Sequence, residues 1–380
     1  MVMVLIIVTF HLALFGTFIT RSGIISSVHT FGVSALGPLF LAFIGIGLAA
    51  SIWLLLSRLG RLKSEGELDS LASRESTFIL NNLILVGATF AILLGTIFPM
   101  ISEAVTGVKV TVGAAYFNRV TVPMFFLLIL LMGICPLIGW RRASPVRDFL
   151  RPLAAALALG TLTFILGVRK PHVIIGLFIC FFVLSTLAIE WFRGVRARHR
   201  TRGENYIKAL LSLVWGNRPR YGGYIVHVAI IFIAIGALGS TAYQVEKEAG
   251  LAPGESMSIE NYTLRYEGLS RYPTATGLVT AATLSVFDGG SPAGTMTAEK
   301  TFHINFDQPV TEVAIRSSLT EDLYVILGGA NASGLAAFRV LINPVVSWIW
   351  LGGAFMLLGG LIALWPEGAP GRSGRAGSPR

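Results

Sequence analysis

The sequence predicts an α-helical polytopic membrane protein with about eight transmembrane helices and a small β-rich extracytoplasmic domain inserted before the last helix. Of its 380 residues, 54% are hydrophobic and 13% are charged, against about 25% charged in soluble domains. Long apolar runs recur along the chain. Between Tyr243 and Pro344 they give way to short segments of alternating apolar and polar residues, a pattern typical of half-buried strands.

The apolar runs define the expected spans, since crossing a bilayer takes roughly 20 apolar residues in helical form. We expect residues 1–242 to form a transmembrane bundle of about seven spans, residues 345–366 to form the final transmembrane helix, and residues 367–380 to be a disordered cytoplasmic tail. The runs begin near Met1, Val33, Phe78, Thr121, Pro152, Val173, Tyr221 and Val345.

Basic residues predict the orientation, because arginine and lysine in short loops are retained on the cytoplasmic side. The alternate connections hold few basic residues, which fits the outer face. We therefore expect a multi-pass protein of the bacterial inner membrane with both termini cytoplasmic and the β-rich domain on the outer, periplasmic side. The basic connections lie within residues 58–74, 141–151 and 193–220, and the tail adds Arg372, Arg375 and Arg380.

Residues 243–344 read as one β-rich domain. The segments from Tyr262 and from Leu278 alternate with period two, as half-buried strands do. Turn residues from Asp288 follow the second segment, and Gly328–Asn331 is an expected loop before the last strand. The polar residues of the later segments are interpreted as outward-facing, either as partner contacts or as solvated strand edges: Glu312, Asp322 and Tyr324.

Composition and motifs also exclude several classes of function. The net charge of +10 lies mostly beside helix ends, where lipids are the expected partner, and no basic face interleaved with aromatics indicates nucleic acid. The two cysteines form no Cys-x-x-Cys pair. Catalysis through a nucleotide loop, a nucleophile elbow or a carboxylate pair has no support in the sequence.

His227 is the strongest candidate for chemistry. It ends the motif Arg220-Tyr-Gly-Gly-Tyr-Ile-Val-His227, about six residues or roughly 9 Å into a span expected to start at Tyr221. Ionisable residues at that depth usually face a partner, a cavity or a cofactor. Gly222 and Gly223 leave room for a flat macrocycle or for a neighbouring helix. The alternative is a neutral histidine hydrogen-bonded between helices.

His29 is the second candidate and is expected near the outer surface. It ends the motif Gly16-Thr-Phe-Ile-Thr-Arg-Ser-Gly-Ile-Ile-Ser-Ser-Val-His29. Imidazole is a common iron ligand, so His29 is either a ligand of a haem at the membrane boundary or an interfacial histidine in contact with water. Arg21 either contacts a haem propionate or anchors the helix end at the headgroups. His11, in an apolar run without a motif, is expected to pack.

These two motifs resemble the C-terminal part of the cytochrome c haem lyases of the CcmF, CycK and NrfE type. That family carries a Gly-Thr-Phe-x-x-Arg-Ser-Gly motif with a histidine after five further residues, and a transmembrane histidine several helices later. The chain also matches the family at segments in between and after, so the resemblance covers nearly the whole chain in order. Those segments begin at Ser73, Thr311, Asp322 and Trp348.

The resemblance implies covalent attachment of haem to the Cys-x-x-Cys-His motifs of apocytochrome c, in cytochrome c maturation outside the cytoplasmic membrane. By carry-over, His29 resembles the outer histidine that ligates haem delivered by a haem chaperone, and is the candidate catalytic residue. His227 resembles one axial ligand of a permanent haem b. Further implied partners are apocytochrome c and its thiol-reducing and presenting subunits.

The chain departs from the family pattern in one large respect. Family members carry an upstream region with a tryptophan-rich haem-handling segment and the opposite haem ligands, which this sequence lacks. Met1 also opens directly into apolar sequence. We therefore expect a thioether-forming haem lyase subunit that needs the missing N-terminal half or a complementary chain. The alternatives are a membrane transporter or permease, or a non-catalytic assembly scaffold of the maturation complex.

Overall fold

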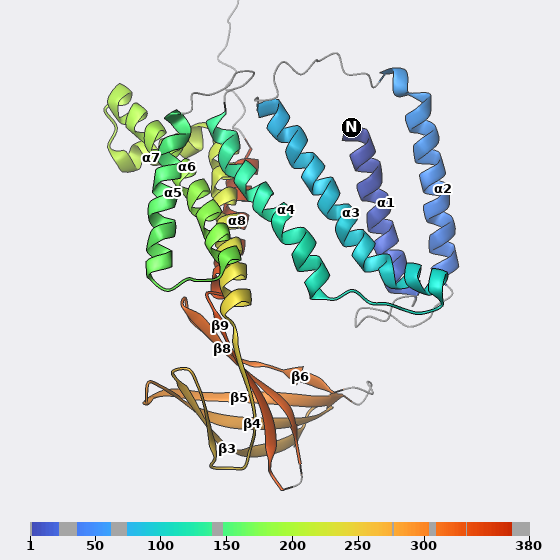
Figure 1. The fold of residues 1–380 in the computed structure, drawn as a ribbon, viewed down its shortest axis with the longest axis vertical. Helices are drawn as coiled ribbons and strands as arrows, with labels where there is room; N and C mark the ends of the chain where they lie inside the picture. The colour runs from blue at the N-terminus through green and yellow to red at the C-terminus, as the bar shows by residue number, and fades with distance from the viewer. Residues whose placement is uncertain are drawn as a thin grey trace, which may run out of the picture. The chain divides into compact units, whose positions relative to one another are not determined.

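The structure is a computed structural model that describes residues 2–22, 36–61, 74–138, 147–275, 277–303, 309–331 and 333–366. The chain forms two compact units (Figure 1). The first unit comprises residues 1–128 and 138–143, and the second comprises residues 129–137 and 144–380. His29 and the tail at 367–380 lie outside the described residues.

Helices make up the described part of the first unit and about half of the second. The first unit contains α1 (Val2–Ser22), α2 (Leu36–Ser57), the 3-10 turn η1 (Leu59–Arg61), α3 (Arg74–Thr106) and most of α4 (Ala114–Ile134). The second unit contains the end of α4, the 3-10 turn η2 (Cys135–Leu137), α5 (Arg147–Ile165), α6 (Pro171–Arg202), α7 (Tyr206–Gly216), α8 (Arg218–Tyr243) and α9 (Ser347–Leu364).

The predicted fold class is confirmed. Among the described residues, 8 helices are long and apolar enough to cross a membrane, and a β domain precedes the last of them. Several helices begin before their apolar runs, at Arg74, Ala114 and Arg218 rather than near Phe78, Thr121 and Tyr221. The physical reason is that helical backbone hydrogen bonds continue into polar flanking residues, which a hydropathy pattern does not register.

A short helix, α7, was not predicted. It lies inside the basic connection between α6 and α8, and its 11 residues are too few to span a bilayer. Asn205 caps it, since its side chain accepts a hydrogen bond from the Lys208 backbone N–H at 2.8 Å. Arg198 Nε donates to Glu204 Oε2 at 2.6 Å, and this bond lowers the pKa of the Glu204 carboxyl. These bonds hold the turn between α6 and α7.

The β domain is a sandwich of two antiparallel sheets, with strand orders β1-β9-β8-β7 and β2-β3-β4-β5-β6. The expected loop Gly328–Asn331 is wrong for its first three residues. Gly328–Ala330 continues β8 through a bulge after Leu327, because a bulge accommodates glycine within a ladder. The strands are β1 (Val245–Leu251), β2 (Ser256–Ile259), β3 (Tyr262–Pro273), β4 (Gly277–Asp288), β5 (Ser291–His303), β6 (Val310–Glu312), β7 (Ala314–Ser317), β8 (Glu321–Ala330) and β9 (Ala336–Pro344).

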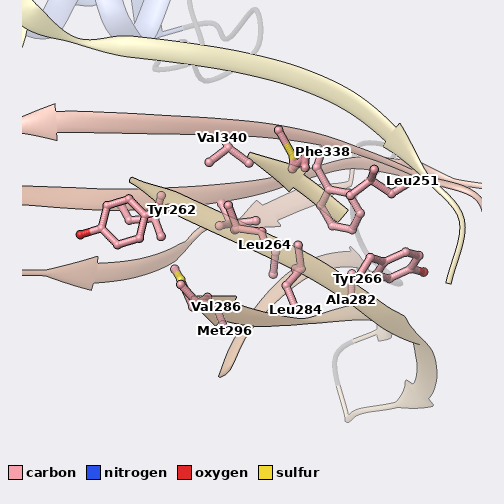
Figure 2. Packing of buried hydrophobic residues seen from close by; sticks show 14 of the residues in the cluster. Leu251, Tyr262, Leu264, Tyr266, Ala282, Leu284, Val286, Met296, Phe338 and Val340 are labelled. Carbon is pink, nitrogen blue, oxygen red and sulfur yellow. The ribbon is translucent and has the colours of Figure 1, made fainter. Parts of the chain in front are cut away.

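Apolar side chains from both sheets fill the space between them (Figure 2). Leu264 and Leu284 are fully buried at its centre. The Tyr266 and Phe338 rings meet at a centroid distance of 5.0 Å, within the range of favourable aromatic pairs. This core gives the sandwich a source of stability that is separate from the helices.

Asp322 ties the sandwich to α9 and corrects an expectation. It was interpreted as an outward polar residue, but it is 2% exposed. Its carboxylate accepts hydrogen bonds from Ser317 Oγ at 2.9 Å, from the Ser318 backbone N–H at 3.2 Å and from Ser347 Oγ at 2.7 Å. Because Ser347 begins α9, the strand alternation alone could not reveal this burial. Glu312 is exposed, as expected.

Candidate functional site

The site is built on α8, which carries His227. Asn217 caps this helix by accepting a hydrogen bond from the Arg220 backbone N–H at 3.3 Å, and Pro219 fits the first turn. Since α8 begins at Arg218, His227 lies nine residues along it, about 13.5 Å from the start at 1.5 Å per residue. The expected depth of roughly 9 Å from Tyr221 is therefore too small when measured from the helix end, because the cap precedes the apolar run.

One face of α8 packs tightly on α9, and Figure 1 shows the two helices running side by side. A Cβ added at Gly222 would lie 2.6 Å from Ala363 N and 2.7 Å from Gly359 O. A Cβ added at Gly352 of α9 would lie 2.7 Å from Ala229 O. Gly222 is therefore required for close approach of a helix, the second of the two roles that its sequence allowed.

A second face of α8 packs on α6. Tyr221, Tyr224 and Ile231 are buried there in one cluster with Val183 and Leu187 of α6. The ring centroids of the two tyrosines lie 5.6 Å apart in an edge-to-face arrangement. This face is ordinary helix packing.

His227 lies on a third face. At 3.6 residues per turn it shares this face with Arg220, Gly223, Ile230 and Ala234, and all but Arg220 are half-buried. A Cβ added at Gly223, one turn before His227, would meet nothing within 4 Å. The His227 Nδ1 atom is buried and has no hydrogen-bond partner among the described residues. An open glycine thus lies next to an imidazole nitrogen whose hydrogen-bonding capacity is unused.

A polar network begins two turns below His227, where this face borders the face that packs on α6. Arg220 Nε donates to Tyr224 Oη at 3.0 Å, and Arg220 Nη2 donates to Glu190 Oε2 at 2.9 Å. The Tyr224 and His227 rings follow at a centroid distance of 6.5 Å. The pairing of Glu190 with Arg220 was not predicted, because the two residues are 30 positions apart. The i to i+4 spacing of Arg220 and Tyr224 was the one local signal.

The other predicted residues lie in the first unit. Arg21 is exposed in the last turn of α1 and interacts within the chain. The motif that leads to His29 is described only as far as Ser22, so no geometry relates Arg21 to His29. His11 is 8% exposed. Its Nδ1 lies 2.8 Å from Ile7 O, and its Nε2 lies 3.4 Å from where a Gly47 Cβ would be, which fits the expected packing role.

Comparison with known proteins adds three findings. A family model described as the CcmF C-terminal beta-sandwich matches residues 242–344. The cytochrome c-type biogenesis protein CcmF of Pseudomonas fluorescens is 31% identical over 361 residues, which cover 94% of this chain and 54% of that protein. CycK of Rhizobium meliloti, another cytochrome c-type biogenesis protein, is 29% identical over 98% of this chain and 56% of that protein.

The fold has a match of the same extent. A solved structure of the cytochrome c haem lyase CcmF superimposes with a TM-score of 0.76 and 25% sequence identity, and covers 96% of this chain and 54% of that chain. The chain thus spans about half the length of the relatives that it matches. Its apolar helices and its bacterial relatives indicate a multi-pass inner-membrane protein.

Proposed function

We infer the function of this chain from its family: in sequence and in fold it corresponds to the C-terminal part of the CcmF-type cytochrome c biogenesis proteins. We propose that it takes part in the covalent attachment of haem to the Cys-x-x-Cys-His motifs of apocytochrome c. In that reaction each cysteine S–H adds across a haem vinyl group. Sulfur bonds to one vinyl carbon, the hydrogen goes to the other, and nothing leaves.

The third face of α8 supports the proposal that this chain binds a resident cofactor. His227 presents an imidazole there whose Nδ1 has no partner among the described residues, and the open Gly223 position lies one turn away. An unsatisfied buried nitrogen costs about 1–3 kcal/mol, and His11 Nε2 and Trp191 Nε1 share this state. The open Gly223 position beside His227 is therefore the observation that favours a group from outside this chain. We propose that His227 would hold the iron of a haem b. When bound, such a haem supplies an iron centre that exchanges single electrons.

Arg220 is our candidate contact for a propionate of that haem. It lies seven residues before His227, about 10.5 Å along the helix on the same face. Its guanidinium is held by Glu190 and Tyr224, and its side chain is 46% exposed. A planar guanidinium suits paired contacts with a carboxylate. Here Arg220 binds and orients, while His227 supplies the ligand nitrogen.

The remaining parts of the site stay proposals from the family pattern. His29, and Arg21 with it, would meet a second, incoming haem that a chaperone delivers on the outer face. The opposite ligands would come from a region that corresponds to the N-terminal half of the relatives or from a complementary chain, and separate thiol-reducing and presenting subunits would bring the apocytochrome c. The fact that the relatives are nearly twice as long as the matched region supports this division.

Two contacts support the proposed orientation. Arg218 Nη1 donates to Pro366 O at 2.9 Å, so the start of α8 and the end of α9 lie together, among the basic residues of the α6–α8 connection. At the other end of α8, the Arg169 backbone N–H donates to Tyr243 Oη at 3.3 Å, beside the first strand of the sandwich. If the more basic end is cytoplasmic, the sandwich is periplasmic and α9 ends inside.

The experiment is a reduced-haem absorption spectrum of the purified chain, alone and co-expressed with the upstream half of a relative. We expect bis-histidine b-type bands in the combined sample, abolished by His227→Ala and reduced when Gly223→Leu fills the open face. Gly360→Leu is the matched control, since Gly360 also has nothing within 4 Å but lies on α9. His11→Ala is the histidine control.

Each outcome bears on a different part of the proposal. Bands that survive His227→Ala would overturn the ligand assignment. Equal losses in Gly223→Leu and Gly360→Leu would show that membrane insertion, and not the third face, had been disturbed. Loss of haem retention in Arg220→Gln but not in Arg218→Gln is expected if Arg220 contacts a propionate. The combined sample could show all the haem bands and yet fail to restore thioether formation in cells that lack the lyase. That outcome would favour a scaffold role.

A further inference from the structure

The β-sandwich contains a partly open pocket that none of the haem chemistry uses. Its volume is about 250 Å³, and it lies between β3, β4 and β5 of one sheet and β8 of the other. Leu278, Phe302 and Leu327 provide apolar walls. Arg271 and Lys300 are its two charged lining residues. The pocket therefore combines an apolar surface with two cations.

The strand register places the two cations close to each other and to the apolar wall. Arg271 is paired with Thr280, and Thr280 with Lys300, so the three side chains form one row across three strands. Two strand spacings of about 4.8 Å separate the outer members of that row. Leu278 and Phe302 are paired two residues further along the same two strands, and so lie on the same face of the sheet.

Within the residues that the structure describes, no ion pair joins an acidic side chain to this row. Lys300 Nζ donates one hydrogen bond to Gly328 O at the bulge of β8, which leaves two of its three donors. Among the described residues, no hydrogen bond or ion pair engages Arg271. Glu299 is adjacent in sequence, but strand alternation turns it to the opposite face, where Tyr272 Oη donates to it at 3.0 Å. A carboxylate of another molecule would complement these two cations.

Size and position narrow the class of ligand. Pockets for cofactors and drug-sized ligands occupy about 300–1,000 Å³, so this one is too small for a macrocycle and suits one large apolar side chain beside a carboxylate. Gly329 lies seven residues along β8 from Asp322, which bonds to the first residue of α9. At about 3.3 Å per residue this is roughly 23 Å along the strand from the helix end, which disfavours a lipid headgroup.

We propose that this pocket binds an acidic and apolar peptide segment of a partner protein, with a carboxylate between Arg271 and Lys300 and a large side chain against Phe302. This interaction goes beyond haem binding and does not depend on it. Charge complementarity would fix the register of the peptide in the pocket, and the apolar side chain would contribute most of its affinity.

The test uses the full chain in phosphatidylcholine nanodiscs and a fluorescein-labelled octapeptide with phenylalanine and glutamate alternating at its centre. We expect saturable binding by fluorescence anisotropy. Replacing the glutamates of the peptide by glutamine, or introducing Arg271→Gln, should weaken binding about tenfold or more, as loss of a charge-assisted hydrogen bond predicts. Phe302→Ser should weaken it as well.

The matched control is Arg265→Gln, on the same strand, because Arg265 already pairs with Glu267 at 2.9 Å. Unchanged affinity in that variant is expected. Equal weakening of peptide binding by Arg265→Gln and Arg271→Gln would show that the affinity depends on overall charge. That result would contradict a binding site at Arg271. Binding that is indifferent to the glutamates would also overturn it. Displacement of the peptide by phosphatidylglycerol vesicles, lost in Arg271→Gln, would assign the pocket to lipid headgroups instead.

Discussion

The β-sandwich and helix α2 are both rich in apolar side chains, but the sandwich buries them within the chain and α2 leaves them exposed. In the sandwich, Leu264, Leu284 and Val325 are completely buried. In α2, none of the 18-residue apolar window is buried within the chain. The difference teaches that one chain is folded for two solvents. The sandwich must build its own core in water, whereas α2 presents apolar surface that is stable only in hydrocarbon.

The second unit contains both situations and a junction between them. The 18-residue window of α6 is 44% buried, because α5, α7 and α8 pack around this helix. The sandwich continues from α8 and returns into α9. Asp322 lies at that return, and its carboxylate accepts three hydrogen bonds. The junction is therefore held by a hydrogen-bonded buried carboxylate and not by apolar packing. The comparison can be tested at the core, at the junction and at one titrating group.

The largest effect is expected in the sandwich core. Phe338→Ala removes an aromatic side chain that is 2% exposed, and should destabilise the sandwich by about 3–5 kcal/mol. Amide hydrogen exchange of the strands in the full chain measures this. Leu361→Ala lies in α9 at a position that is 64% exposed. It should change the stability of the sandwich, measured by the same exchange, by less than about 0.5 kcal/mol. Equal effects would contradict the division into two solvents.

An intermediate effect is expected at the junction. Asp322→Ala removes the acceptor of the Ser318 N–H and of the Ser317 and Ser347 hydroxyls, at a cost of about 1–3 kcal/mol. Faster hydrogen exchange should then extend over β8 and the start of α9. Asp322→Asn, which keeps one acceptor oxygen, should lose less. The exposed Glu312→Ala is the control, and a loss there as large as in Asp322→Ala would count against the junction.

The smallest effect is a pH dependence of the sandwich. Burial, together with a hydrogen bond to Glu321, raises the pKa of the Tyr262 phenol to about 12. The unfolded phenol titrates near 10. Because the folded pKa is raised, this contribution to stability is fully present below pH of about 10 and is lost as the pH rises through about 12. Ultraviolet difference titration of the protein and of Tyr262→Phe measures it. A Tyr262 step near pH 10 in the folded protein would contradict the burial.

Much of the fold was predictable from local patterns. Eight apolar runs predicted eight membrane helices, since length and hydropathy are properties of contiguous residues. Period-two alternation predicted the strands from Tyr262 and Leu278, because strand side chains alternate between faces. Helix α7 was missed since its run is short and lies among basic residues. The bulge at Gly328 was missed since glycine indicates loop and bulge alike.

The candidate site was predictable only in part. The motif located His227 in a membrane helix, but two glycines in a row could not show which of them faces α9. Arg220 was visible as a basic residue, whereas its partner Glu190 comes from another helix. The burial of Asp322 depends on Ser347, which is 25 positions away. Contacts between distant segments leave no periodic trace in a sequence.

Sequence alone determined the class of this protein, its membrane helices, its inserted β domain and the two histidine motifs, because composition and short-range periodicity respond to solvent. Tertiary structure decided which face of α8 is free. Gly222 is occupied by α9 and Gly223 is open, although the two are chemically identical. The physical reason is that a side chain's neighbours are set by the packing of helices and sheets, and a shift of one residue rotates a helical position by about 100°.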